Sequence, residues 1–438
     1  MMPMKATLIK RECKMLKRVE RHIVTKTDKN YEAIKEICHK SKNLYNYANY
    51  ILRKSFFETN KLPNEYDLVK ILTAQNQNDY RSLPAQTAQQ TIKLLFKNWK
   101  SFFRAVKAYQ QDKFKFKERP RIPKFKPRSN QGFYMTVFTN QQIKSKNNLI
   151  NFPKFSNLKP ITTKVSSIKQ VRLIPDTACF IVEIVYEKDI RQIEIKQGSI
   201  AAIDLGLNGF VTFLDNQGNQ PFIINGKGAK SYNQFYNKRK ANLRSQLPKN
   251  IFSSNELRRL ELIRNLFMQN FLHQSSSIVI KALIERKIET LVIGLNEDWK
   301  QKISLGKITN QNFVSIPYRK LVDQLIYKCE EIGIKVILTE EAYTSKIDHF
   351  IAEEMKHHDE YAGKRIHRGL FRSSLNFVIQ SDVNGALGIM RKVFPEKALA
   401  LANLIRNRGV AFTPIIINPI SLSAVNHSRL ATNNTNAF

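Results

Sequence analysis

Residues 200–215 read IAAIDLGLNGFVTFLD, and this stretch decides how the C-terminal half of the chain is expected to fold. Apolar residues on both sides of a short glycine-containing segment predict two strands joined by a tight turn. Asp204 follows directly after four apolar residues. A carboxylate in such a strand is costly unless a metal or another cation neutralises it. Asp204 is therefore a candidate metal ligand, with a buried, hydrogen-bonded structural Asp as the alternative.

The residues that follow continue an α/β pattern. Hydrophobic periodicity predicts helices at about 232–246 and 253–287, a strand at 290–294, a helix near 317–332, a strand at 335–339 and a final helix from about Asp382. Ser253 and Glu256 have the spacing of a capping box at the start of the second helix. Asp382 begins an apolar-faced helix, where the alternative is a plain helix cap. Two such aspartates are of the type that holds divalent ions for phosphodiester hydrolysis.

Net charge restricts the class of partner. The 438 residues include 72 Lys and Arg against 36 Asp and Glu, which gives a net charge of +36 and a pI near 10. Such a surplus predicts a polyanionic partner, and nucleic acid is the first to consider. No apolar run approaches the roughly 18 residues of a membrane span, and the first twenty residues lack the apolar core of a secretory signal. Four widely separated cysteines without a CxxC pair favour a reducing cytosol.

The N-terminal half is predicted to combine helices, a basic arm and short strands. Periodicity predicts helices at about 30–57 and 85–109, and β-branched segments within 132–195 predict a small β-barrel or sandwich. Residues 113–128 read KFKFKERPRIPKFKPR, with eight basic residues, one acid and three prolines. The prolines exclude a helix, so we expect a strand or extended arm along nucleic-acid phosphates, with a solvated linker as the alternative. The candidate contacts are Lys113, Lys115, Lys117, Arg119, Arg121, Lys124, Lys126 and Arg128.

Five blocks in the C-terminal 240 residues share one family pattern: IDLGLNGF (203–210), HQSSSIV (273–279), EAYTSK (341–346), GKRIHRGLFRS (363–373) and SDVNGALGIMRK (381–392). They resemble the TnpB (OrfB) family of transposon-encoded RNA-guided nucleases, relatives of the type V CRISPR effectors. Two N-terminal blocks resemble the family's helical domain and the entry to its wedge-like β-barrel more loosely: KNLYNYANYILR (42–53) and RPRIPKFK (119–126).

The resemblance implies a mixed architecture: an RNase H-like (RuvC) α/β nuclease domain with inserted helices, and an N-terminal wedge β-barrel interrupted by a helical recognition domain. The implied domains are the first part of the barrel (1–29), the helical domain (30–112), the basic arm with the rest of the barrel (113–196), the nuclease domain (197–417) and a disordered tail (418–438).

The implied activity is cleavage of double-stranded target DNA next to a short adjacent motif. The implied partners are that DNA and a guide RNA from the transposon end or a CRISPR array, and no membrane. The implied cofactor is Mg²⁺, as two ions for which Mn²⁺ can substitute, held by Asp204 and Asp382 with a third acid. Candidates for reading the adjacent motif are Tyr45, Tyr50, Gln89 and Gln90.

The third acid is the first departure from the family pattern. Many relatives have a Glu at the end of the strand that here ends in Gly294. Some relatives use a relocated Glu before the YTS block, which points to Glu341, with Glu340 beside it. Glu297, three residues past the strand, is the remaining alternative. Successive strand residues face opposite sides, but the unknown strand end leaves the choice between Glu340 and Glu341 open.

The second departure is the absence of cysteine pairs from the interval 347–381, where relatives commonly bind zinc. The interval contains four histidines without ligand spacing, so we expect no zinc: His349, His357, His358 and His367. Basic residues of its GKRIHRG segment are expected to contact nucleic-acid phosphates: Lys364, Arg365 and Arg368.

Three functions remain in view. The first is an RNA-guided DNA endonuclease in a prokaryotic cytoplasm, associated with the nucleoid. The second is a nuclease-inactive RNA-guided repressor, which would be expected to lose active-site acids. The third is a RuvC-like resolvase or transposase, for which the large basic N-terminal half is unnecessary.

Overall fold

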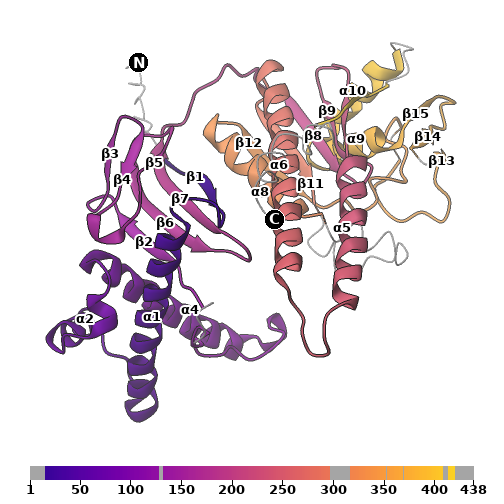
Figure 1. Cartoon of the computed structure of the whole chain (residues 1–438). Helices are drawn as coiled ribbons and strands as arrows, with labels where there is room; N and C mark the ends of the chain where they lie inside the picture. The colour runs from indigo at the N-terminus through magenta and orange to yellow at the C-terminus, as the bar shows by residue number, and fades with distance from the viewer. Residues whose placement is uncertain are drawn as a thin grey trace, which may run out of the picture. The chain divides into compact units, whose positions relative to one another are not determined.

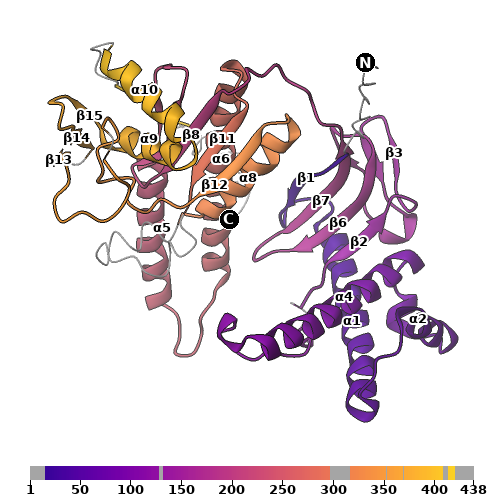
Figure 2. The same ribbon diagram turned by 180° about the vertical axis from the view of Figure 1, so that it is seen from behind.

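The computed structural model describes residues 15–127, 132–295, 316–351, 353–367, 369–407 and 413–419. The chain divides into two compact units, residues 1–189 and 190–438, which are treated separately below (Figures 1 and 2). From residue 420 onward, the predicted disordered tail lies outside the described residues. Among the described residues, no helix has the length and apolar character needed to cross a bilayer.

The first unit contains two antiparallel sheets. One has the strand order β1-β7-β6-β2, formed by Leu16–Val24, Phe180–Lys188, Ile168–Pro175 and Thr136–Thr139. The other has the order β3-β4-β5, formed by Lys144–Lys146, Leu149–Asn151 and Ile161–Thr162. The predicted strands are therefore present, while their closure into a wedge barrel stays a prediction.

The helices of the first unit share one core with the larger sheet. They are α1 (Tyr31–Thr59), α2 (Glu65–Ala74), α3 (Asn78–Arg81) and α4 (Ala85–Gln111), with short 3₁₀ turns η1 (Lys113–Lys115) and η2 (Lys154–Ser156). The helices α1 and α4 pack on the sheet, and α2 and α3 pack on the other helices. The two long helices confirm the predictions for 30–57 and 85–109. Their apolar stripes are buried because residues three and four apart share one face of a helix.

The second unit is built on a six-stranded mixed sheet with the order β12-β11-β8-β9-β10-β16. Its strands are Lys335–Thr339, Thr290–Gly294, Ile200–Leu205, Gly209–Asp215, Phe222–Asn225 and Ile415–Ile417. The three strands β12, β11 and β8 are parallel to one another, and β9 runs antiparallel to both of its neighbours, β8 and β10. The stretch 200–215 forms the predicted pair of strands at the centre of this sheet.

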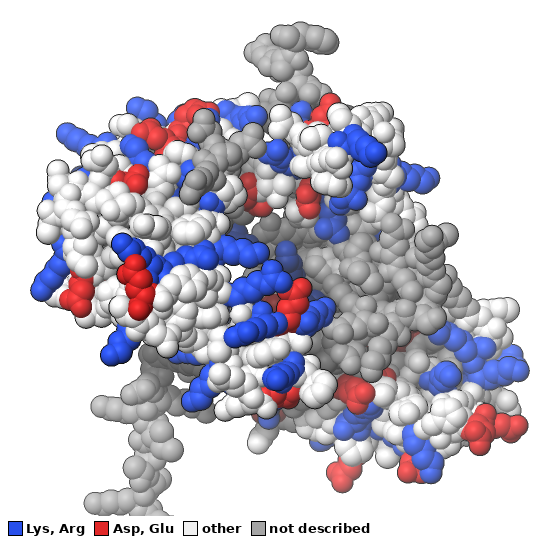
Figure 3. Space-filling view, turned by 90° about the horizontal axis from the view of Figure 1, so that it is seen from below, with Lys and Arg blue, Asp and Glu red and all other residues white. Residues whose placement is uncertain are grey.

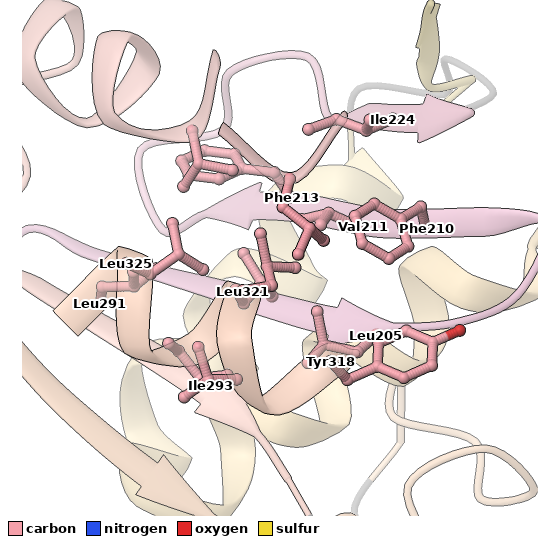
Figure 4. Packing of buried hydrophobic residues seen from close by; sticks show 14 of the residues in the cluster. Leu205, Phe210, Val211, Phe213, Ile224, Leu291, Ile293, Tyr318, Leu321 and Leu325 are labelled. Carbon is pink, nitrogen blue, oxygen red and sulfur yellow. The ribbon is translucent and has the colours of Figure 1, made fainter. Parts of the chain in front are cut away.

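Helices cover both faces of the sheet (Figures 1 and 2). One face packs on α5 (Lys227–Ser245), α6 (Asn255–Glu285) and α8 (Tyr318–Glu331). Figure 4 shows this core, with Tyr318, Leu321 and Leu325 of α8 against Leu205, Val211 and Ile293 of the strands. The other face packs on α9 (Ser381–Val393) and α10 (Pro395–Asn407). Because the two faces are covered by helices, the ends of the strands are where a site is expected among the described residues.

Some features of the second unit differ from the predictions. The helix α6 begins one residue later than the capping-box prediction requires: Ser254, and not Ser253, is the N-cap, and its hydroxyl accepts a hydrogen bond from the Leu257 amide. The pattern also missed α10, β16 and a three-stranded antiparallel sheet within the insertion, β13-β14-β15, formed by Lys364–His367, Leu370–Arg372 and Val378–Gln380. These strands are three or four residues long, too short to show an alternating pattern.

Candidate active site

Asp204 lies near the end of the central strand β8 and faces α9. Because side chains alternate along a strand, Asp204 shares its face with Ile200 and Ala202, which pack with residues of α9 and α10. On one side Asp204 is paired with Thr212 of β9. On the other side Ile203 is paired with Ile293, which puts Asp204 beside the end of β11. The carboxylate is half-buried where the sheet meets the start of a helix.

Asp382 lies in the first turn of that helix, α9. The N-cap is Gln380, whose side-chain oxygen accepts a hydrogen bond from the Val383 amide at 2.8 Å. The Gln380 amide nitrogen donates to Asp382 Oδ2 at 3.1 Å. The alternative role of Asp382 as the helix cap is therefore taken by Gln380. The Asp382 carboxylate reaches the sheet instead, since a Cβ added at Gly209 would lie 2.7 Å from its Oδ2.

Glu341 follows β12 by two residues and extends over the end of the neighbouring strand. In the parallel pairing of β11 and β12, Thr339 is opposite Gly294. Glu341 lies in the turn just after this strand, and a Cβ added at Gly294 would lie 2.7 Å from Glu341 Cγ and 2.8 Å from its Oε1. The side chain of Glu341 thus lies over the position from which the expected strand-end acid is missing. Glu340 is exposed, and Glu297 lies outside the described residues.

The three acids form one electrostatic group. Burial, and after it the charge of Asp382, raises the pKa of Asp204 to about 7, although the Arg365 guanidinium opposes the shift. Burial, and after it the charge of Asp204, raises the pKa of Glu341 to about 8, with Lys392 acting in the opposite direction. Burial also raises the pKa of Tyr318, again reinforced by Glu341 and Asp204. Negative charge is therefore concentrated here beyond what the nearby cations offset.

This donor set fits a divalent cation. Carboxylate oxygens are the ligands that Mg²⁺ prefers, and a cation would relieve the repulsion that raises the pKa values of Asp204 and Glu341. Within the described ranges, three or more His, Cys, Asp or Glu side chains are nowhere gathered closely enough to form a ready-made metal site. The acids would therefore have to move closer to one another to share an ion.

The histidines of the insertion differ in their surroundings. His349 is fully buried, its ring Nε2 lies 2.8 Å from the Thr344 carbonyl, and burial lowers its pKa to about 4. His358 lies 2.7 Å from the Glu354 carbonyl through Nε2. The expectation that the protein binds no zinc stays a prediction.

Basic residues predicted to contact nucleic acid are mostly exposed. On the arm, the exposed ones are Lys113, Lys115, Lys117, Arg119, Arg121 and Lys124. Lys126 is half-buried, with its ammonium 5.2 Å from the ring centroids of Tyr45 and Tyr134. In the second unit Lys364 and Arg365 are exposed, and Arg365 donates to the Ser381 hydroxyl at 3.0 Å. Arg128 and Arg368 lie outside the described residues.

The arm is attached to α1 through its backbone. Apart from η1, its described residues form no regular helix or strand. Asn46 exchanges two hydrogen bonds with the backbone of Lys126, and the Asn49 amide donates to the Pro123 carbonyl at 3.1 Å. Asparagines within an amphipathic helix were the available signal for this attachment, and sequence reasoning missed it.

The candidates for reading an adjacent motif are not equivalent. Tyr45 is 1% exposed and its ring centroid lies 4.4 Å from that of Tyr134, so it is a core residue and is not accessible to DNA. Tyr45 belongs to the apolar stripe of α1, which does not favour its predicted role in reading the motif, and that role stays a prediction. Tyr50 is 56% exposed, Gln89 is exposed and Gln90 is half-buried.

Comparisons with known proteins place this site in a family context. The family model OrfB_IS605, described as a probable transposase, matches residues 183–300, and the Cas12f1-like TNB domain matches residues 318–389. The TnpB-like protein ORF457 of Acidianus two-tailed virus is 26% identical over 225 residues, which cover 47% of this chain and 44% of that protein. The match thus spans less than half the length of that relative.

Solved structures give a likeness of fold. A Cas12f1 complex with single guide RNA and target DNA aligns with a TM-score of 0.50 and 13% identity, over 83% of this chain and 82% of that one. Together these findings confirm the resemblance to the TnpB family, which is related to the type V effectors.

Proposed function

We propose that this TnpB-like chain is a transposon-associated, RNA-guided DNA endonuclease of the prokaryotic cytoplasm, with Asp204, Glu341 and Asp382 as its metal-binding acids. The observation that carries the proposal is that these three carboxylates, from three separate parts of the chain, lie near the same end of a mixed sheet, although farther apart than a shared ion would require. The order β12-β11-β8-β9-β10, with β9 antiparallel, supports an RNase H-like (RuvC) arrangement.

The chain's own residues would perform distinct tasks. Asp204 and Asp382, on the sheet and on α9, would hold Mg²⁺ together with Glu341. The raised pKa values of Asp204 and Glu341 favour exchange of their protons for a cation. When bound, two Mg²⁺ ions activate a water and stabilise the leaving oxygen in phosphodiester hydrolysis. Arg365, at the edge of the site, would contact a phosphate of the substrate strand.

The partners follow from charge and from the structural neighbour. A net charge of +36 needs a polyanion on a scale that no small ligand supplies. The Cas12f1 neighbour was solved with guide RNA and target DNA, and base pairing to a guide would supply sequence recognition while the protein contacts backbones and an adjacent motif. A discrete co-purifying RNA is expected; a smear of lengths or no RNA contradicts the proposal.

Matched substitutions test the acids. Asp204→Asn, Asp382→Asn and Glu341→Gln keep size and hydrogen-bonding reach but remove the charge that a hard cation prefers. Each is expected to abolish cleavage of a target plasmid by the RNA-loaded protein while target binding persists. Glu340→Gln is the control because that side chain is exposed, and Glu297→Gln completes the set.

Three outcomes would change the assignment. Cleavage by Asp204→Asn or Asp382→Asn refutes the metal-binding acids. Loss of activity in Glu340→Gln or Glu297→Gln, but not in Glu341→Gln, assigns the third acid elsewhere. A wild-type complex that binds its target and never cuts is the repressor alternative.

A further inference from the structure

The backbone of Glu341 is fixed by the turn that follows it. Thr344 donates two hydrogen bonds to the Glu341 carbonyl, from its amide at 3.2 Å and from its hydroxyl at 2.9 Å. Thr344 is 4% exposed, and Tyr343 within the turn has a left-handed φ of 64°. A non-glycine residue in that conformation persists only when its surroundings hold it there, so the turn 341–344 needs further support.

His349 provides that support from five residues away. Burial, reinforced by the charge of Arg391, lowers its pKa to about 4, so the ring is neutral at pH 7 and carries a single N–H. A carbonyl can only accept, and Nε2 lies 2.8 Å from the Thr344 carbonyl. The hydrogen is therefore on Nε2, and Nδ1 accepts from the Arg391 guanidinium at 3.4 Å.

The same contacts connect this turn to α9, the helix that carries Asp382. Arg391 belongs to α9 and also donates to the Glu353 carbonyl at 2.7 Å. Asn384 of α9 donates to the Ile347 carbonyl at 2.9 Å. A Cβ added at Gly388 would overlap His349 Nε2, so the helix admits the ring only because residue 388 has no side chain. The segment 341–353 is thus hydrogen-bonded to the helix that holds the second acid.

We propose that His349 is a positioning residue that holds Glu341 in register with Asp382, by bridging the Thr344 carbonyl to Arg391 of α9. The inference rests on the proposed function, because it assumes that Glu341 and Asp382 act on the same cation. It gives a role to a histidine that the sequence brought into view only for zinc, and for which the lack of ligand spacing argued against zinc. Both of its ring nitrogens already have hydrogen-bond partners, so zinc binding would require breaking this bridge.

Two substitutions separate positioning from simple packing. His349→Gln places an amide N–H close to where Nε2 lies, so it keeps the bond to Thr344, whereas His349→Leu removes both polar atoms. His358→Leu is the matched control, because His358 also contacts a backbone carbonyl within the insertion but in a different turn. Thr344→Val is a second, smaller perturbation, which deletes only the hydroxyl bond to Glu341.

Two readouts are needed. The first is Mn²⁺ affinity of the full chain without nucleic acid, from the free Mn²⁺ signal in electron paramagnetic resonance, with Asp204→Asn as the background. The second is the single-turnover cleavage rate of the RNA-loaded protein. Loss of a residue that orients a metal ligand costs about 10–100-fold in affinity or rate. We expect a loss of that size in His349→Leu, a smaller one in Thr344→Val, and retention of most of both quantities in His349→Gln and His358→Leu.

Each outcome has a separate meaning. Wild-type Mn²⁺ affinity and rate in His349→Leu, together with an inactive Glu341→Gln, overturn the positioning role and leave the endonuclease intact. Equal losses in His349→Gln and His349→Leu also overturn it, because shape and not the hydrogen bond would then be required. If His349→Leu does not fold, Thr344→Val decides, and its wild-type behaviour refutes the proposal. A wild-type chain that neither binds Mn²⁺ nor cuts refutes the proposed function itself.

Discussion

Each acidic side chain of the site lies against a glycine from another element. Asp382 approaches Gly209 of β9, Glu341 approaches Gly294 of β11, and a Cβ added at Gly385 of α9 would lie 2.8 Å from Asp204 Oδ2. Real Cβ atoms do not come so close to a carboxylate, so in each case the glycine leaves the space that the oxygen occupies. The site therefore depends on three glycines, which contribute only by having no side chain where the carboxylates lie.

Gly385→Ala tests this dependence. Alanine is favoured over glycine in a helix by about 1 kcal/mol, so the melting temperature is expected to stay level or rise. The new methyl group displaces the Asp204 carboxylate, and a displacement on the order of 1 Å can cost about 100-fold in rate. Cleavage kinetics and a melting curve of the same preparation measure both effects.

Gly228→Ala in α5 is the matched control, because its Cβ would meet nothing within 4 Å. Full cleavage in Gly385→Ala would contradict the placement of Asp204.

The raised pKa values predict how the metal-free protein responds to pH. The pKa of Asp204 rises from 3.8 to about 7 and that of Glu341 from 4.5 to about 8. The folded state therefore binds these protons more tightly than the unfolded state, and this stabilisation is complete below the unfolded pKa values and is lost as pH rises through about 7 to 8. Melting temperatures in EDTA should accordingly fall as pH rises from the unfolded pKa values to the folded ones, and should level off above about 8.

Asp204→Asn removes the interaction and should flatten the dependence relative to wild type. Parallel pH curves for the two proteins would contradict the assigned burial and repulsion. Mg²⁺ should restore wild-type stability most strongly near about pH 8, where the acids are ionised.

At this scale the sequence singled out two acids and left alternatives open for the third. Asp204 and Asp382 could be selected because each stands at the end or the start of an apolar element. Glu340 and Glu341 could not be separated, since the choice depends on the pairing of Thr339 with Gly294. His349 could not be given a role from the sequence, because its partners, Thr344 and Arg391, are defined only by the folded chain.

At the scale of elements, the buried carboxylate of Asp348 connects two parts of the insertion 347–381. Asp348 is fully buried and its Oδ2 accepts hydrogen bonds from the Ser373 hydroxyl at 2.8 Å and from the Ser374 amide and hydroxyl at 2.8 and 2.9 Å. Its Oδ1 accepts from the Phe350 amide at 3.1 Å. This one side chain joins the residues after β12 to the loop between β14 and β15.

Asp348→Asn is expected to destabilise the second unit. The new amide nitrogen cannot accept the three bonds to Ser373 and Ser374, and an unsatisfied buried group costs about 1–3 kcal/mol. The melting temperature should therefore fall by several degrees, and protease should cut the insertion sooner.

Asp359→Asn, at an exposed position of the same insertion, is the control. An unchanged melting temperature and proteolysis pattern in Asp348→Asn would mean that the strands of the insertion are stable without the hydrogen bonds to Asp348.

The elements most readily predicted were those long enough to show a periodic pattern of apolar residues. The helices α1, α4, α6 and α8 and the strands β8, β9, β11 and β12 lie within a few residues of their predicted bounds. The strands of the insertion are too short to show alternation, and β16 is defined by its pairing with β10, far away in the sequence. The capping residue of α6 was misplaced by one because Ser253 and Ser254 are adjacent and chemically equivalent.

At the scale of the whole molecule, positive charge dominates the surface. Figure 3 shows one face on which Lys and Arg side chains are more abundant than Asp and Glu. Some lysines of the chain already have an acidic partner on the same helix. Lys35 is paired with Glu32, and Lys40 is paired with Glu36. On the arm Lys115 lies 3.5 Å from Asp112. Residues 113–128 nevertheless hold one acid against eight basic residues, so the lysines of the arm are better placed to bind phosphates.

Neutralising Lys113, Lys115 and Lys117 with glutamine should weaken binding of guide RNA without changing sequence preference. The slope of log affinity against log salt should fall by about one for each lost phosphate contact. Filter binding at several salt concentrations measures this slope.

The control changes Lys35, Lys40 and Lys54 to glutamine, so the loss of charge is the same. Each of these lysines has an acidic partner on α1. If the slope of log affinity against log salt falls by the same amount in both triple variants, the arm contributes only its share of the net charge and has no specific role.

The contact between Gly294 and Glu341 also limits how such a site can change through descent. A carboxylate-bearing side chain at 294 would occupy the volume that Glu341 already fills, because even a Cβ there lies 2.7 Å from Glu341 Cγ. An ancestor with both acids in this packing is therefore excluded. A lineage that moves the acid between the two strands must pass through a form that lacks it, or must change both positions at once. The two positions are therefore expected to covary as an exclusive pair, one acidic where the other is small.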